Sequence, residues 1–283
     1  SRFLNSGAHA KACSHSRPRR HPIFHFDMSA CSHIPLAAKH LACLAMAFFS
    51  LSSQAEGTHK HWNYERGHEG PAHWADIEPT FETCGKGQLQ SPIDIRHAVK
   101  AALPALQFNY SPINLNLTNN GHTVQVVVPP GQTLTVGDQS YELLQFHFHT
   151  PSEEAVQGRR TAMVAHFVHK NAAGQLGVIG VLIQPGKTNA AYAPVFAHLP
   201  RQGEHITVDE LQLNLGALLP ANKAYYKYAG SLTTPPCSEG VNWMVLKNPI
   251  QLGAEQIKAF RRIFNANARP IQPGHGRVIQ ESL

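Results

Sequence analysis

The sequence predicts a mainly β protein of the α+β class, in which one domain is built on a central, twisted and mostly antiparallel sheet with short peripheral helices. Short apolar runs bounded by Pro, Gly and Asn clusters recur along the chain, as expected of strands. The runs do not alternate with helical segments, so a parallel sheet wound with helices is not indicated. A hydrophobic fraction of 42% with only 15% charged residues suits a packed globular core.

The elements follow in order along the domain. His59 to Ile95 is rich in turn residues, with room for a short helix at Ala72–Ile77. Strands are predicted at Leu115–Leu117, Thr123–Val128, Thr133–Val136, Leu143–His149, Ala162–His169, Gly177–Ile183 and Trp243–Leu246. Helices are predicted at Asn189–His198 and at Ala254–Phe264, where apolar residues recur at helical spacing.

Residues 1–55 are predicted to be a leader and residues 56–283 the single folded domain. The apolar run Leu41–Leu51 ends near small residues that suit signal-peptide cleavage after Ala55. Its 11 residues are fewer than the about 20 that span a bilayer. The alternative is a buried helix of the domain. Residues 1–27 precede the first Met and are compatible with sequence upstream of the true start, and the signal predicts export to the periplasm or beyond the cell.

A net charge of +6 is typical of many nucleic-acid-binding proteins, but its distribution along the chain argues against such a partner. Residues 1–55 hold six basic residues and one acidic residue, which leaves 18 basic and 17 acidic residues in the domain. No basic stripe remains there for phosphates. Of the five cysteines, Cys84 and Cys237 stay after removal of the leader. In an oxidising compartment such a pair most simply forms a disulfide, and two buried free thiols are the alternative.

A histidine pair lies in an apolar strand. His147 and His149 are two residues apart, so on a strand both point to one face while Phe146 and Phe148 pack on the other. Buried imidazole nitrogens need partners, and a metal ion satisfies both. By itself, a His-x-His pair is weak evidence for a metal site.

The strand Ala162–His169 offers a third ligand. His166 and His169 lie three apart and face opposite sides, so only one joins the pair; His166 is chosen and His169 is interpreted as structural. Three neutral His ligands leave a fourth position open, as in catalytic zinc sites.

Six segments in register resemble the α-class carbonic anhydrases, and the Cys pair resembles the bacterial branch. The match runs from about His61 to Ile279. The segments are Gln90–Asp94, Asn119–His122, Gln145–His149, Ala165–His169, Gly230–Cys237 and Asn267–Pro270. The resemblance implies a zinc enzyme with Zn²⁺ in a cleft of the sheet. It would hydrate CO₂ reversibly to bicarbonate and a proton by attack of zinc-bound hydroxide.

The resemblance also implies the roles of single residues. Thr233 would orient the hydroxide by donating its proton to Glu153, although the neighbouring Glu154, which stands where many relatives carry His, is the alternative acceptor. His122 would relay protons, for which an ordinary His pKa of about 6.5 is suited. The substrate would meet Val168, Val178, Leu232, Thr234, Val241 and Trp243. Without the family these residues would pass as loop or core positions.

The resemblance also implies hydrogen bonds that hold the rings of the three histidines. Gln145 is expected to bond His147, and the Asn267 carbonyl to bond His149. Relatives carry an acidic residue two before the third ligand, where this chain has Val164. Since Val accepts no hydrogen bond, either a water or a backbone carbonyl is expected to hold His166, or its outer nitrogen stays unpaired. Bacterial members of the family are often dimers, so the resemblance also implies a homodimer.

Two rival classes are weaker. Cupins combine His-x-His with a nearby Glu, but no later His follows their Pro-x-Gly turn here. Non-catalytic relatives of the carbonic anhydrases have lost zinc-binding histidines, whereas all three stand here together with Thr233 and Glu153.

Overall fold

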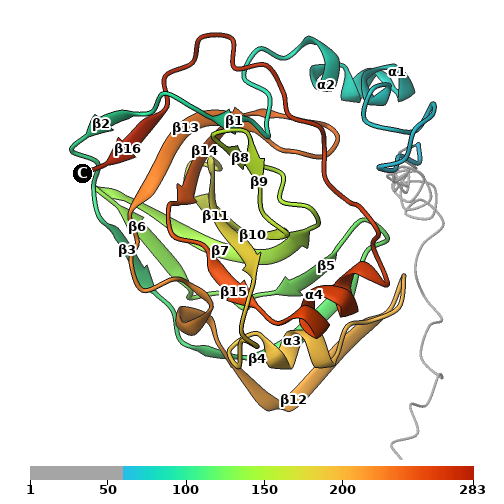
Figure 1. The fold of residues 1–283 in the computed structure, drawn as a ribbon, viewed down its shortest axis with the longest axis vertical. Coiled ribbons are helices and arrows are strands. Elements are labelled where there is room, and N and C mark those ends of the chain that lie inside the picture. Colours follow the sequence, from blue (N-terminus) through green and yellow to red (C-terminus); the bar gives the residue numbers. More distant parts are fainter. Residues whose placement is uncertain (1–59) are drawn as a thin grey trace, which may run out of the picture. The chain divides into compact units, whose positions relative to one another are not determined.

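The computed structural model describes residues 60–283, and the predicted leader lies outside the described residues. A 13-stranded sheet dominates this part of the chain (Figure 1). Its main path runs in the order β12-β4-β5-β7-β10-β11-β14-β13-β16-β2, with β15 added beside β11 and the pair β3 and β6 beside β7. A small sheet of order β1-β8-β9 completes the β structure. The prediction of a mainly β fold is confirmed.

The strands have the following bounds in the structure. They are β1 Asp94–Ile95, β2 Val99–Ala101, β3 Leu106–Asn109, β4 Pro112–Asn119, β5 Val124–Val127, β6 Thr133–Val136, β7 Gln139–His149, β8 Ala155–Val156, β9 Arg159–Arg160, β10 Met163–Asn171, β11 Leu176–Pro185, β12 His205–Asn214, β13 Tyr225–Ser231, β14 Glu239–Leu246, β15 Ile250–Leu252 and β16 Gln280–Ser282. Most pairs of neighbours are antiparallel, as predicted. The parallel pairs of the large sheet are β11 with β14, β11 with β15, and β16 with β2.

The helices are short and peripheral. They are α1 Trp74–Ile77, α2 Thr83–Lys86, α3 Ala193–Ala197 and α4 Ala254–Arg261, with 3₁₀ turns at Pro79–Phe81 and Leu215–Leu218. Helix α4 starts where the Gln256 side chain accepts a hydrogen bond from the Gly253 N–H at 3.0 Å, a capping contact. It buries Ile257 and Phe260 and stops before Ile263, which is 37% exposed. None of the helices in the described residues is long and apolar enough to span a membrane.

The two faces of the central strands serve different purposes because alternate side chains point to opposite faces. From β7 and β10, one face sends Phe146, Phe148 and Phe167 into the main core, where Phe146 and Phe167 stack at 4.7 Å between ring centroids. The other face carries the histidines and a smaller apolar cluster that includes Val164 and Trp243. The packed core therefore fixes the strands that present the histidines.

A disulfide joins Cys84 of α2 to Cys237 in the loop between β13 and β14. The two residues are 153 positions apart in the sequence. Both are buried in a third cluster with Trp74 and Phe81. The disulfide ties the N-terminal helices to the loop that carries Thr233.

Candidate metal centre

The pairing of β7 with β10 brings three histidines together. In the antiparallel register His166 lies opposite His147, and Val164 lies opposite His149. One nitrogen from each of His147, His149 and His166 falls within 4.8 Å of the others. Among residues 60–283 this is the one set of three or more His, Cys, Asp or Glu side chains that converges in this way.

The rings of the two β7 histidines are oriented by hydrogen bonds from Nδ1 to oxygen acceptors. His147 Nδ1 lies 2.8 Å from Gln145 Oε1, and His149 Nδ1 lies 2.6 Å from the backbone oxygen of Asn267. Each contact makes Nδ1 the donor and leaves Nε2 with its lone pair facing the centre. His149 Nε2 is buried and has no hydrogen-bond partner. A buried polar atom without a partner is costly, so a metal ion fits this position.

The third ring is held differently from the predicted arrangement. His166 Nε2 lies 3.1 and 3.2 Å from the two carboxylate oxygens of Glu154, which leaves Nδ1 for the centre. Val164 does face the same side and is fully buried. The expectation that a water or a backbone carbonyl holds His166 is wrong, because Glu154 reaches the ring from the loop after β7.

Burial also keeps the β7 ligands neutral. It lowers the pKa of His147 to about 3, and the neighbouring His166 adds to the effect. The pKa of His149 is likewise well below its usual value, mainly through burial. Burial opposes charge on His166 as well, but the nearby Glu154 and Glu153 raise its pKa overall. Neutral imidazoles are the form that binds metal, so burial prepares His147 and His149 for this role. Three histidine ligands with a fourth position open suit catalytic zinc.

Glu153 lies beside the centre without occupying it. Its Oε2 is 3.6 Å from His149 Nε2 and 3.8 Å from His166 Nδ1, beyond hydrogen-bond range. Its Oε1 accepts a hydrogen bond from the Arg269 N–H at 2.8 Å. Burial raises the pKa of Glu153 to about 7, while a hydrogen bond from the Thr233 hydroxyl opposes the rise. The structure therefore brings Thr233 and Glu153 together.

The predicted substrate-contacting residues form one apolar cluster. Val178, Val241 and Trp243 are each 2% exposed within it, and Val168 and Leu232 pack against its edge. The Trp243 ring lies 4.9 Å from that of His166, which puts the cluster beside the third ligand. Thr234 is half-buried, and its carbonyl accepts from the Cys237 N–H at 2.8 Å in a turn.

His122 belongs to a turn that Asn267 connects to the site. Its ring stacks on Trp62, with centroids 3.7 Å apart and planes 6° from parallel. Partial burial, and to a lesser extent His61, lower its pKa. Its backbone oxygen accepts from Asn267 Nδ2 at 3.0 Å, so Asn267 links the His122 turn to the ring of His149. A hollow of about 770 Å³ is lined by residues that include Tyr64 and His122, but by none of the three converging histidines. The Tyr64 ring lies 6.5 Å from the ring of His149.

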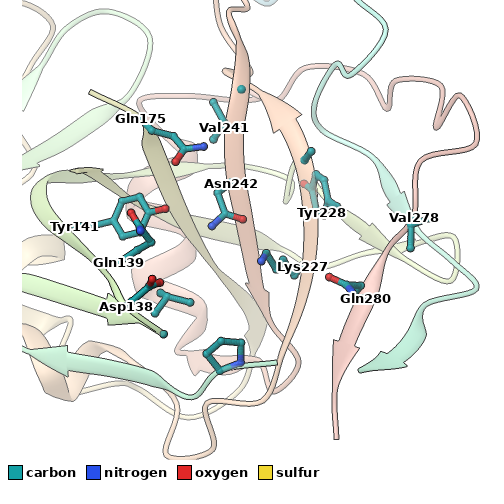
Figure 2. A pocket seen from close by; sticks show the side chains of 15 residues that line it. Asp138, Gln139, Tyr141, Gln175, Lys227, Tyr228, Val241, Asn242, Val278 and Gln280 are labelled. Carbon is teal, nitrogen blue, oxygen red and sulfur yellow. The ribbon is translucent and has the colours of Figure 1, made fainter. Parts of the chain in front are cut away.

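A second groove lies away from the metal ligands. Figure 2 shows its lining, which includes Tyr141, Gln175 and Asn242 in a space of about 600 Å³. Val241 is its one residue from the predicted substrate-contacting set. Because none of the three histidines lines it, this groove is not the zinc cleft.

Sequence reasoning missed Glu154 as a contact of His166 and gave no role to Arg269. The Arg269 guanidinium is buried and donates to Gln90 Oε1, Ser91 O and Cys84 O at 2.8–2.9 Å. It thus joins the N-terminal segment to the segment that holds Glu153. The sequence pointed in part to a role for Arg269, since both Gln90–Asp94 and Asn267–Pro270 belong to the motifs that match the family.

The fold and the site define a zinc enzyme with three histidine ligands on a large, mostly antiparallel sheet. The family model described as eukaryotic-type carbonic anhydrase matches residues 69–283. A carbonic anhydrase from Pectobacterium carotovorum is 44% identical over 220 residues, which cover 77% of this chain and 90% of the relative. The chain belongs to the eukaryotic-type, or α, carbonic anhydrase family.

Solved structures agree with this assignment. A hyperthermostable carbonic anhydrase from a hydrothermal vent chimney superimposes with a TM-score of 0.76 at 43% identity, over 79% of this chain and 100% of the other. The α-carbonic anhydrase of Thermovibrio ammonificans, in complex with the inhibitor sulfanilamide, gives 0.75 at 41% identity, over 78% and 98%. The chain is therefore a zinc-dependent lyase that reversibly hydrates carbon dioxide to bicarbonate and a proton.

Proposed function

We propose that His147 and His149 hold the catalytic zinc through Nε2 and that His166 holds it through Nδ1. The observation that carries this proposal is the convergence of three ring nitrogens, one of which is buried without any partner. In this class of enzyme, zinc is known to lower the pKa of its bound water to about 7, which supplies the nucleophile near neutral pH. The protein's part is to orient that water, to hold CO₂ and to remove a proton.

Thr233 and Glu153 orient the attacking water in this proposal. In this proposal the Thr233 hydroxyl donates to Glu153, a contact that lowers the pKa of the carboxyl and opposes the effect of its burial. The Thr233 oxygen can then accept only from the water, so a lone pair of the water faces the substrate. Glu153 is itself fixed by the Arg269 N–H, which keeps the direction of the Thr233 proton constant.

The cluster around Trp243 provides the CO₂ position. CO₂ is apolar and uncharged, so a wall of Val178, Val241 and Trp243 favours it over water. The wall lies beside His166, because the Trp243 ring is 4.9 Å from the His166 ring. Val168, Leu232 and Thr234 complete the edge of this position.

His122 carries the proton from the cleft to solvent. It is half-buried, with one face of its ring stacked on Trp62. His122→Ala should leave exchange between CO₂ and bicarbonate nearly intact but slow net hydration in dilute buffer by about 10²-fold or more. Added imidazole should restore much of the loss. Unchanged hydration in dilute buffer would reduce His122 to a turn residue.

Residues 1–55 are proposed to be a leader that carries a signal peptide, which directs the domain of 56–283 to the periplasm or out of the cell. The apolar run before Ala55 and the Cys84–Cys237 disulfide support this proposal, since disulfides persist in oxidising compartments. N-terminal sequencing of the exported protein should start at Glu56.

A homodimer is the proposed assembly. The mass of the purified protein in solution tests this proposal.

The direct test of the proposed site combines metal content with activity. The purified domain should contain one zinc per chain and hydrate CO₂, and a sulfonamide should inhibit it, as the sulfanilamide complex of the relative suggests. Removal of zinc should abolish hydration, and zinc should restore it. A zinc-free protein with full activity would overturn the proposal.

A further inference from the structure

The carboxylate that contacts the third histidine comes from a loop and not from the histidine's own strand. Both oxygens of Glu154 lie within 3.2 Å of His166 Nε2, and Glu154 is fully buried. Val164 stands two residues before His166 on the same face of β10 and has no atom that accepts a hydrogen bond. The ring therefore depends on a residue twelve positions away in the sequence.

The loop around Glu154 is held in place by hydrogen bonds of its own. Ser152 Oγ donates to the Glu154 carbonyl and accepts from the Thr161 N–H, both at 2.8 Å. The next residue, Ala155, donates its N–H to Ile93 O at 3.2 Å and begins the short strand β8. These contacts fix the backbone on both sides of Glu154, so its side chain is directed at His166 by a rigid segment.

The burial of Glu154 needs an explanation. His166 is the one hydrogen-bond partner that residues 60–283 offer its two oxygens. A buried carboxylate with so few partners is costly. The cost is offset if the other nitrogen of His166 binds a cation, because the ring then passes positive charge to Nε2–H and strengthens that hydrogen bond.

We infer that Glu154 is the positioning residue for His166: it fixes the proton on Nε2, directs Nδ1 to the zinc and slows zinc loss, in place of an acceptor at position 164. The inference rests on the proposed zinc site. Glu153, the neighbour of Glu154, contacts Thr233 and Arg269 instead of the ring of His166. The two adjacent carboxylates therefore have different roles. The expected effect of losing such a contact is about 10–100-fold in zinc retention.

Zinc transfer from the loaded protein to a chelator tests the inference. Glu154→Leu removes both acceptors at similar volume and should speed zinc loss about 10–100-fold. Glu154→Gln keeps one acceptor without the charge and should lie between Glu154→Leu and the wild type. Glu281→Gln removes a carboxylate paired with Lys247 away from the site and should leave the rate unchanged. A folded Glu154→Leu or Glu154→Gln protein that loses zinc at the wild-type rate would overturn the inference.

A spectroscopic readout separates positioning from a general structural role. In the zinc-loaded wild type, NMR of ¹⁵N-labelled histidine should show a downfield His166 Nε2–H proton, and Glu154→Gln should move it upfield. An unmoved proton would contradict the inference. Val164→Glu, with Glu154 present, should lower the melting temperature and should not slow zinc loss; slower loss would show that Glu154 leaves the nitrogen free. If the wild type fails to bind stoichiometric zinc, the proposed site itself fails, and not the role of Glu154 alone.

Discussion

Buried histidines on the two faces of strands β7 and β10 differ in how completely their ring nitrogens are hydrogen-bonded. On the core side, His169 is fully satisfied: Nε2 lies 2.6 Å from the Tyr110 hydroxyl, and Nδ1 lies 2.9 Å from the Phe167 carbonyl. On the cleft side, His149 has one nitrogen bonded to Asn267 O and the other without a partner. Both side chains are buried. A buried ring whose hydrogen bonds are all made stabilises a fold, whereas a buried ring left incomplete indicates a ligand.

The cleft face itself contains a second contrast. His147 and His149 rest on neutral oxygens, while His166 rests on the carboxylate of Glu154. A charged acceptor makes the stronger hydrogen bond and donates more electron density to the ring. We therefore expect His166 to be the ligand whose orientation matters most to zinc retention.

The largest expected effect comes from replacing the two histidines of β10 one at a time. His166→Ala should lose tight zinc binding and CO₂ hydration together. If the about 10–16 kcal/mol of a zinc site is shared among its ligands, one ligand is worth roughly 3 kcal/mol or more, a hundredfold or more in affinity. Zinc content after dialysis measures the loss. His169→Gln is the matched control and should keep its zinc; the opposite outcome would make His169 the ligand.

The core-face histidine should make stability depend on pH. Burial lowers the pKa of His169 to about 4, while the unfolded chain titrates near 6.5. Above pH 6.5 the ring is neutral in both states and contributes nothing. As pH falls from 6.5 to 4, the unfolded state takes up a proton that the folded state refuses, so stability falls, by about 3 kcal/mol in all.

Chemical denaturation of the wild type and His169→Gln at several pH values isolates this effect. Other titrating groups are common to both proteins, so the difference between the curves belongs to His169. The difference in free energy of unfolding between the wild type and His169→Gln should narrow below pH 6.5. The wild type loses stability there through its ring, whereas the variant has no ring to protonate. Curves that stay parallel down to pH 4 would show that His169 titrates normally in the fold.

The smallest effect compares the neutral acceptor with the charged one. Gln145→Leu removes the oxygen that holds His147 and should speed zinc loss to a chelator about tenfold. Glu154→Leu should exceed it. Equal rates for the two variants would remove the distinction between the charged and neutral contacts, and the melting temperatures of the zinc-free proteins serve as the control for folding.

The sequence predicted those parts of the fold whose pattern is local. Strands β7, β10 and β11 were found because they are apolar and bounded by turns. Strand β12 was missed because it is mostly exposed and pairs only with β4, which leaves it without an apolar repeat. Helix α3 is shorter than predicted, since it starts only at Ala193, and α4 ends at Arg261, after which Ile263 remains exposed.

The residues of the site also divide into those that a local pattern or motif predicts and those that only tertiary contacts place. Alternation on a strand places His147 and His149 together, and family motifs supplied Gln145 and Asn267. Glu154 could not be assigned, because the path of a loop depends on tertiary contacts such as those of Ser152 with Thr161. Arg269 was missed for the same reason, since its partners lie about 180 residues earlier in the chain.

The measurement that tests the central claim most directly is a crystal structure of the zinc-loaded protein with anomalous data at the zinc edge. One strong peak should appear on the cleft face, about 2.0–2.1 Å from Nε2 of His147, Nε2 of His149 and Nδ1 of His166, the usual zinc–nitrogen distance. Glu154 should remain within hydrogen-bond distance of His166 Nε2. A peak bound by His169, a His166 ring turned to coordinate through Nε2, or no zinc at these three residues would contradict the account.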